Sequence, residues 1–454
     1  MTDADRNWRR FVLFRVLFNA RFYYPVLAVL FLDLGLSATE YTLLNFAWAI
    51  AIVFTDLPAG VLADRIGRRP LVIAAASFMV AEMTLLILAP LRGGIVLLLC
   101  CLANRILSGM AEGMASGADE ALTFDSLAEC GRSNEWPRVL DHVMRWQGVG
   151  MVIAMLVGGA VYDPNAMNRL FAFFGSNPHF TQGTTLRFPI YLNLLTAVAT
   201  LITALGLREP KLREKQIVGR VADRRACRPD TTPDDGSGIA NAERTAFNLV
   251  RHVGAWIWQT PVALFVIVAG VLMDSVVRLF LTFSSSYFRL IEIPGVFFGL
   301  IGASMGGIGM LVAPLARRMV AANSLAKNYA ILATIILAGL IGVAIRWNYG
   351  GVIFIVPLTG AMMALGYMES YYLNAIADSA HRATVLSFKG VATNLAYGFI
   401  SLLFALVLRA VRDRGDAQAA FSHGLLFLPA WLLFGALLCT ILFRRHAKAL
   451  TIKP

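Results

Sequence analysis

The residues most able to do chemistry in this chain are ionisable side chains that lie inside long apolar runs. A charge at membrane depth costs about 2.5–3.5 kcal/mol on insertion scales, so each such group needs a partner, a water-filled cavity or a function. Carboxyls in apolar surroundings can take up and release protons near neutral pH, which is the chemistry of proton coupling. The groups concerned are Arg21, Glu82, Arg105, Glu112, Arg145, Asp274, Arg278, Glu369 and Lys389.

Glu112 is the first candidate for a proton carrier. Arg105 and Glu112 are seven positions apart and therefore share a helix face, with Ser108 nearby. Gly109 and Gly113 occupy a neighbouring face, where they would let another helix approach closely. An alternative is that Arg105 and Glu112 form a permanent ion pair.

Glu369 is the second proton candidate, because no basic residue lies at helical spacing from it. It either pairs across to another helix, with Arg21 as the expected partner, or it titrates. Asp274 is a further coupling candidate, although Asp274 and Arg278 are four apart and can neutralise each other. Glu82 is expected to make a structural polar contact.

Aromatic residues accompany the charges at two places. Tyr23 and Tyr24 follow Arg21, and Tyr367 and Tyr371 flank Glu369. Charge beside aromatic surface suits an amphipathic organic substrate, held by stacking or cation–π contact, whereas helix packing is the alternative role. The predicted substrate cavity contains Arg21, Tyr23, Tyr24, Ser108, Arg278, Tyr367 and Tyr371.

The elements that carry these residues are predicted to be membrane-spanning helices. The chain has 58% hydrophobic and only 15% charged residues, which places it in the membrane class. Runs this long must be helices, because hydrocarbon leaves no partner for an unpaired backbone amide. The fold is therefore predicted to be all-α with twelve spans, near 11–32, 41–61, 71–91, 95–122, 144–161, 188–207, 262–283, 296–315, 329–344, 352–373, 385–408 and 425–443.

The charge distribution predicts the topology. The net charge of +12 concentrates in the loops that face inside if the N-terminus is inside, as the positive-inside rule requires. Both termini are then cytoplasmic, and nucleic acid is not expected as a partner. A polar, partly disordered cytoplasmic linker at 208–259 is expected to divide the chain into six-helix bundles at 1–207 and 260–454. An outer insertion at 162–187 is either a cap over the outer mouth or a spacer.

One loop has a specific pattern. The segment Gly60-Val-Leu-Ala-Asp64-Arg65-Ile-Gly67-Arg68-Arg69-Pro-Leu closely resembles the loop between the second and third helices of major facilitator superfamily (MFS) transporters, G-x-L-A-D-R-x-G-R-R/K-x-x-L. The segment from Arg105 to Gly109 similarly resembles the R-x-x-x-G element of the family's fourth helix. This resemblance implies that Arg105 takes part in proton coupling, as the matching arginine does in proton-coupled members.

The resemblance implies an MFS fold, with two parallel six-helix repeats and a substrate site near the midplane, working by alternating access. It also implies a gating role for the loop, Gly60, Asp64, Arg65, Gly67, Arg68 and Arg69. These charges are expected to bridge to the inner end of span four, where Asp119, Glu120 and Asp125 lie, and to hold the inner side shut when the outer side is open.

The direction of transport is the finer question. The chain resembles bacterial drug/proton antiporters, which usually carry G-x-x-x-G-P-x-x-G-G in span five. Here the segment Gly150–Gly159 keeps Gly158 and Gly159 but has Ala154 and Met155 in place of the Gly-Pro centre. Proton-coupled efflux is the first expectation, and import by proton symport is the alternative. Carboxylates serve Na⁺ as well as H⁺.

Other classes of protein are disfavoured. There is no G-x-x-x-x-G-K-S/T phosphate loop for an ATP-driven pump, and no catalytic constellation for an enzyme. The cysteines lack metal-ligand spacing, so no metal or cofactor is expected. A non-transporting sensor or scaffold would predict a broken loop motif. The expected partners are a small-molecule substrate and the lipid bilayer, and the protein is expected to be a monomer in the inner (cytoplasmic) membrane.

Overall fold

The computed structural model describes residues 3–91, 93–176, 179–209, 253–377, 382–412, 417–446 and 450. Within these ranges the regular structure is entirely helical, and twelve helices are long and apolar enough to cross a membrane. The prediction of an all-α protein with twelve spans is confirmed. Most of the expected linker at 208–259 lies outside the described residues. The side chains of Asp64 and Arg65 do too, although both residues are helical.

The chain forms two compact units. Unit 1 contains Met1–Asp223 and Thr282–Gly306, and unit 2 contains Arg224–Leu281 and Gly307–Pro454. A segment that follows the seventh span thus packs with the first part of the sequence. The division into bundles at 1–207 and 260–454 stays a prediction, and each unit is described separately below.

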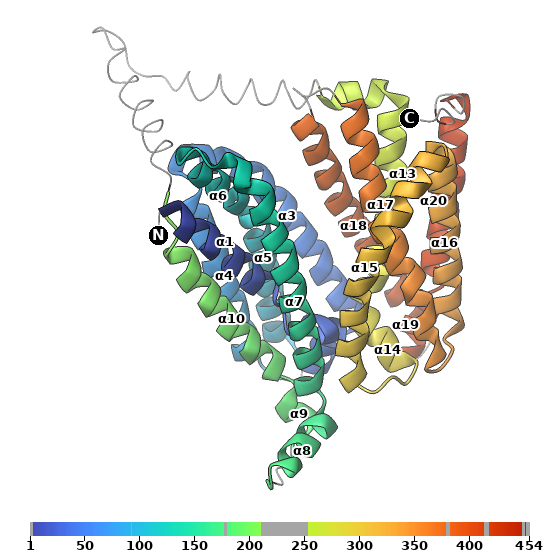
Figure 1. Cartoon of the computed structure of the whole chain (residues 1–454). Coiled ribbons are helices and arrows are strands. Elements are labelled where there is room, and N and C mark those ends of the chain that lie inside the picture. The colour runs from blue at the N-terminus through green and yellow to red at the C-terminus, as the bar shows by residue number, and fades with distance from the viewer. Residues whose placement is uncertain are drawn as a thin grey trace, which may run out of the picture. The chain divides into compact units, whose positions relative to one another are not determined.

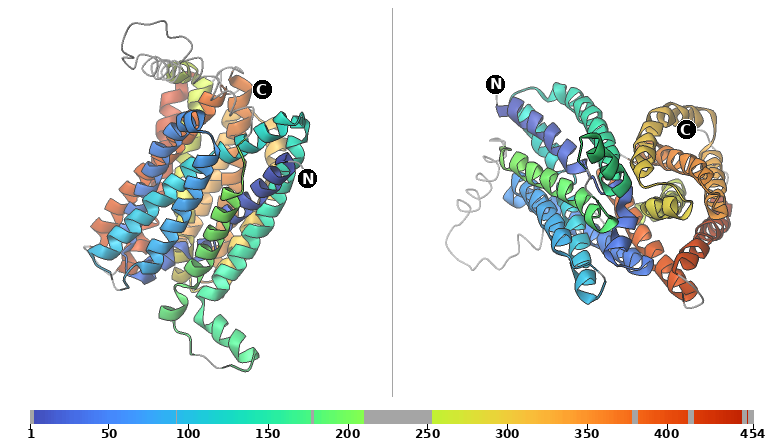
Figure 2. Two further views of the ribbon diagram at one scale, coloured as in Figure 1. Left: turned by 90° about the vertical axis from the view of Figure 1, so that its left-hand side faces the viewer. Right: turned by 90° about the horizontal axis from the view of Figure 1, so that it is seen from below.

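Unit 1 is built from the first six spans (Figure 1). Its helices are α1 (Asp3–Asn19), η1 (Tyr24–Val26), α2 (Leu27–Leu34), α3 (Ala38–Ile66), α4 (Arg69–Leu88), α5 (Ile95–Ala115), α6 (Ala118–Glu129), η2 (Ser133–Glu135), α7 (Trp136–Tyr162), α8 (Pro164–Phe173), α9 (Gln182–Thr185) and α10 (Phe188–Leu205). To these it adds α14 (Ser284–Leu290) and the beginning of α15 (Val296–Ala322). Figure 2 shows α10 running beside α1 and α4, in agreement with their packing.

The glycines of α5 allow this helix to pack closely against α3. A Cβ added at Gly109 would lie 2.7 Å from the backbone oxygen of Trp48, and one at Gly113 would lie 3.0 Å from the backbone nitrogen of Asp56. No larger residue fits these positions without moving a helix. The small residues therefore bring α5, which carries Arg105 and Glu112, against its neighbour.

The first span is not one helix, as the run at 11–32 indicated, but is interrupted between α1 and α2. Pro25 lacks a backbone N–H and its ring blocks a continuing helix, so α1 ends at Asn19 and the chain restarts through η1. The backbone N–H of Phe22, freed by the break, donates to the Asn193 side chain of α10 at 2.8 Å. A neighbouring helix thus satisfies the exposed backbone, as hydrocarbon surroundings require.

The described residues of the insertion at 162–187 include the short helices α8 and α9. They extend beyond the ends of α7 and α10, at the bottom of Figure 1. Asn168 of α8 joins this helix to the segment before α9, because its side chain both donates to and accepts from the backbone of Phe180. Phe173 and Phe174, at the end of α8, are exposed.

Unit 2 contains the remaining spans. Its helices are most of α13 (Pro261–Thr282), the later part of α15, and then α16 (Leu325–Ile345), η3 (Gly350–Phe354), α17 (Ile355–Ile376), α18 (Arg382–Arg412), α19 (Ala417–Gly424), α20 (Phe427–Phe443) and η4 (Arg444–His446). The helix α16 packs against α17 and α20, and α18 packs against α17 and α19.

Candidate functional site

Arg21 lies in the interruption of the first span and pairs with Glu82 of α4. The guanidinium Nη1 donates to the Glu82 carboxylate, and both side chains are buried, with 2% and 0% exposed. The guanidinium also lies over the ring of Phe18, 5.1 Å from its centroid. Arg21 is therefore neutralised within unit 1, where Glu82 makes the ionic contact that had been expected of Glu369.

Glu112 lies on α5 near this pair but has no partner of its own in the described part of the chain. Among the described residues its carboxylate forms no hydrogen bond and no ion pair, although the charges of Arg21, Glu82 and Arg105 act on it. The side chain is partly exposed. Glu112 can thus lose or gain a proton without breaking a contact of the folded state.

Arg105 does not pair with Glu112, so the permanent ion pair considered as an alternative is absent. Arg105 Nη2 instead donates to Asn45 Oδ1 at 3.0 Å, and its guanidinium lies 5.3 Å from the ring centroid of Trp48. The side chain is buried and, in the described part of the chain, has no carboxylate partner. Ser108 is buried one turn away on the same helix.

Glu369 pairs within unit 2. Its Oε2 lies 2.8 Å from the Lys389 ammonium of α18, whereas its Oε1 is buried without a hydrogen-bond partner. Glu369 therefore pairs with a residue of another helix, as one of the two expectations held, but the partner is Lys389 and not Arg21. The spacing rule missed Lys389 because the two residues lie on different helices, twenty positions apart.

Asp274 and Arg278 form the expected pair along α13. Arg278 Nη2 lies 2.9 Å from Asp274 Oδ2, and its Nη1 donates to Asn394 Oδ1 at 3.3 Å. The ring of Tyr397 lies 5.8 Å from the guanidinium. This arrangement agrees with the mutual neutralisation that the spacing of four predicts.

The aromatic residues differ in exposure. Tyr23 is buried and meets Tyr24 edge-on at 5.3 Å, while Tyr24 is 38% exposed. Tyr371 is 41% exposed and meets Tyr372 in the same geometry, and Tyr367 is partly exposed. In each unit, therefore, one tyrosine near the charged group is exposed: Tyr24 near Arg21 in unit 1, and Tyr371 near Glu369 in unit 2.

The motif loop is anchored by an ion pair and by a capping carboxylate. Arg68 Nη1 lies 2.7 Å from Asp125 Oδ2 of α6, which joins the loop to the segment after span four. Gly67 has φ +96°, which favours glycine, and a Cβ there would lie 3.1 Å from the Glu209 carboxyl. Gly60 meets no such neighbour.

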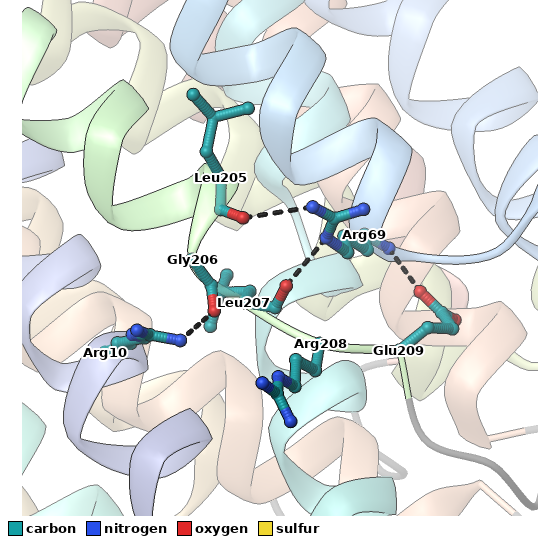
Figure 3. A pocket seen from close by; sticks show the side chains of 7 residues that line it. All are labelled: Arg10, Arg69, Leu205, Gly206, Leu207, Arg208 and Glu209. Atoms are coloured by element: carbon teal, nitrogen blue, oxygen red, sulfur yellow. Dashed lines mark hydrogen bonds between the residues drawn. The ribbon is translucent and has the colours of Figure 1, made fainter. Parts of the chain in front are cut away.

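Glu209 and Arg69 exchange contacts between α4 and α10 (Figure 3). The Glu209 carboxylate accepts the backbone N–H of Arg68 at 3.0 Å and of Arg69 at 2.8 Å, capping the start of α4. In return Arg69 donates to the carbonyls of Leu207 and Leu205 at the end of α10. Sequence reasoning missed Glu209, for which an acid directly after the sixth span was the only signal.

Asp119 and Glu120, which had also been expected to pair with the motif loop, instead pair with α1. Arg15 of α1 lies 2.6 Å from Asp119 Oδ2 and 2.5 Å from Glu120 Oε1. They therefore tie α6 to α1, while Asp125 contacts the motif loop.

The family model described as Major Facilitator Superfamily matches residues 11–405, which is most of the chain. The chain belongs to this superfamily. Among curated proteins none matches the sequence.

Solved structures of MFS transporters resemble the chain over nearly its whole length. The nucleoside transporter NupG has a TM-score of 0.69 at 11% identity, covering 98% of this chain and 99% of its own. A bacterial homolog of the human lysosomal transporter Spinster, in an inward-facing and unoccupied conformation, scores 0.68 at 15%, covering 99% and 98%. A D-xylose-proton symporter scores 0.60 at 16%, covering 95% and 97%. At these identities the likeness shows the MFS fold alone.

One further charge cluster of this MFS chain was not predicted. Arg289 of α14 makes two hydrogen bonds to the Asp33 carboxylate of α2, at 2.6 and 2.8 Å, and the Tyr162 hydroxyl donates to the same carboxylate. The side chain of Asp163 accepts the backbone N–H of Val296 at 2.9 Å. All these residues belong to unit 1, so the cluster holds the Thr282–Gly306 segment in this unit.

Proposed function

We propose that this MFS protein is a secondary transporter that moves a small, amphipathic organic molecule and couples its movement to protons, with efflux across the inner membrane as the direction. Glu112 is the first proton carrier and Glu369 the second. The observation that carries the proposal is the state of Glu112: a carboxylate in the middle of a span that makes no hydrogen bond or ion pair among the described residues.

Such a carboxylate is costly in a membrane unless it has a function. The other acids of the described spans near it, Glu82 and Asp119, are both held in ion pairs. Protonation of Glu112 breaks no hydrogen bond or ion pair with the described residues, whereas protonation of Glu82 would leave Arg21 buried without its counter-ion. Glu112 is therefore the group of this cluster that can change charge at the lowest cost.

Arg105 supplies the second half of the mechanism. It lies about 10 Å from Glu112 along α5, two helical turns away. Among the described residues its only hydrogen-bond partner is the neutral side chain of Asn45. Deprotonated Glu112 attracts this guanidinium, and a substrate with an anionic or aromatic group competes for it. A proton and a substrate thus influence each other through the charge of Arg105.

The test uses proteoliposomes that contain the purified full-length protein and a panel of fluorescent organic cations and acids. An imposed pH gradient is expected to drive substrate movement by the wild type, and Glu112→Gln is expected to abolish the gradient dependence while exchange of substrate at equal pH continues. Glu292→Gln, which removes an exposed carboxylate outside the spans, is the matched control. Movement that ignores the pH gradient in the wild type contradicts proton coupling, and dependence on a Na⁺ gradient instead would assign the same carboxylate to Na⁺.

Import by proton symport is the second candidate. The outer glycines of span five, which had favoured the antiporter interpretation, have a packing role that is independent of direction. A Cβ at Gly158 would lie 1.8 Å from the backbone oxygen of Phe22, and one at Gly159 would lie 2.7 Å from the backbone nitrogen of Gly299. Lower accumulation of substrate in energised cells supports efflux, and higher accumulation supports import.

The gating role proposed for the motif loop rests on the Arg68–Asp125 pair, since the side chains of Asp64 and Arg65 lie outside the described residues. A latch between the loop and α6 is formed or broken as the inner side closes or opens. Residues of this latch are expected to change the rate of conformational exchange and to leave substrate affinity nearly unchanged.

A further inference from the structure

A pocket lies where the beginning of α4, the end of α10 and the first helix α1 meet. It is lined by Arg10, Arg69, Leu205, Gly206, Leu207, Arg208 and Glu209, all within unit 1 (Figure 3). Three of these residues are arginines. The pocket lies at the end of the spans that carries the motif loop, at the level where apolar helices give way to charged segments.

Two of the arginines have no acidic partner among the described residues. Arg10 Nη1 donates to the carbonyl of Gly206, and Arg69 donates to Leu207 at 2.6 Å and Leu205 at 3.0 Å. Carbonyls at a helix end carry partial charges only, so they fix the two guanidiniums without neutralising them. Each guanidinium has five N–H donors, and most of these remain available.

Glu209 is the one carboxylate in the pocket lining, and it already accepts hydrogen bonds from the protein backbone. Glu209 accepts two backbone N–H groups at the start of α4 and forms no ion pair with Arg10 or Arg69. The pocket therefore has a positive excess that is held in place by backbone hydrogen bonds. Arginine pairs of this kind favour a phosphate group, whose oxygens accept two N–H groups from one guanidinium.

An apolar stripe leads from the membrane to this pocket along α10. Leu195 is 67% exposed, Ile202 66% and Leu205 52%, and with Val198 they recur at helical spacing on one face. Leu205 is both the last member of the stripe and part of the pocket wall. A lipid acyl chain can follow the stripe while its headgroup occupies the pocket.

We infer that this pocket binds the phosphate of an anionic phospholipid from the leaflet on the motif-loop side. The stripe favours a lipid over free phosphate, because free phosphate would make no use of it, and basic pockets between helices at this level are suited to acidic headgroups. The occupant would bridge α1, α4 and α10 beside the loop. The inference does not depend on the substrate or on proton coupling.

The test measures lipid binding to the full-length protein in detergent by native mass spectrometry, with phosphatidylglycerol as the probe and phosphatidylcholine as the zwitterionic reference. The wild type is expected to retain one phosphatidylglycerol in preference to phosphatidylcholine, and raised salt is expected to reduce this preference. Arg10→Gln is expected to weaken phosphatidylglycerol binding roughly tenfold, as loss of a charged hydrogen bond implies. Arg9→Gln, an equal change of charge at an exposed position of the same helix, is the matched control.

Three results would overturn the inference. The first is a wild type that binds the two lipids equally, or that prefers phosphatidylglycerol independently of salt. This wild-type measurement is decisive even if the Arg10→Gln variant does not fold. The second is an equal loss in Arg9→Gln and Arg10→Gln. The third is displacement of phosphatidylglycerol by inorganic phosphate at millimolar concentration, which would assign the pocket to the free anion.

Discussion

Arg21 and Glu82 form an ion pair whose two side chains are almost wholly removed from solvent, 2% and 0% exposed. Neither partner can be taken away alone without leaving a buried charge. Together they fix the interruption of the first span against α4, because Arg21 sits within the break and Glu82 within a continuous helix.

Glu82→Gln is expected to lower the free energy of unfolding by about 3–5 kcal/mol, because it leaves the Arg21 charge uncompensated. The double variant Arg21→Met with Glu82→Leu is expected to recover most of this loss, since apolar residues of similar volume often replace a buried pair at little cost. Denaturant unfolding in detergent micelles measures both. A Glu82→Gln variant as stable as the wild type would contradict the role of the pair.

Gly158→Ala is expected to destabilise the protein by about 1–3 kcal/mol, because the added methyl group collides with the backbone of Phe22 at the helix break. Gly148 lies on the same helix α7 with nothing within 4 Å of its Cβ position, so Gly148→Ala is expected to be neutral or stabilising by up to about 1 kcal/mol. Thermal unfolding of the two variants compares them directly. Equal effects would show that the close approach of α7 to the break is not essential.

Asp125→Asn and Arg68→Gln are each expected to change the rate of conformational exchange by up to about fivefold, in line with about 0.2–1 kcal/mol for a partly exposed pair. The double variant is expected to show no further change in the exchange rate, because each single variant already removes the Arg68–Asp125 ion pair. Stopped-flow fluorescence of a labelled protein gives the rates, and equilibrium binding gives the affinity. A large loss of affinity with a normal exchange rate would place these residues in binding instead.

Arg289→Gln is expected to increase hydrogen exchange of α14, because this arginine makes two hydrogen bonds from its helix to the Asp33 carboxylate of α2. The exposed Arg318, on α15, offers a control change of the same charge. Mass spectrometry of peptides covering 284–290 follows the exchange. Unchanged protection in Arg289→Gln would mean that other contacts hold the segment, such as the Ser285 hydroxyl, which accepts the backbone N–H groups of Ala28 and Val29, or the packing of Phe283 on Tyr41.

Hydropathy and the loop motif were sufficient to predict the twelve helices and the superfamily, since both depend on local sequence. The partners of the buried charges were not predictable in this way. Spacing along one helix correctly indicated the Asp274–Arg278 pair, but Glu82 and Lys389 reach their partners from other helices, and only the packing of the helices decides which side chains meet.

The interruption of the first span could have been predicted from one residue of the sequence, Pro25. Pro25 lies inside a run that its hydropathy predicts to be one continuous helix, and proline in a helix interior removes a hydrogen bond. What the sequence does not show is that Asn193, far along the chain, would satisfy the freed N–H of Phe22.

The cluster of Asp33, Tyr162 and Arg289 constrains how the protein is made. Asp33 and Arg289 are 256 positions apart, so at about 5–20 residues per second the ribosome needs roughly 10–50 s after Asp33 to supply its partner. Until then Asp33 and Tyr162 lack their contacts with the Arg289 guanidinium. Unit 1 is thus completed late in synthesis, and a nascent chain stopped before Thr282 cannot close this end of the unit.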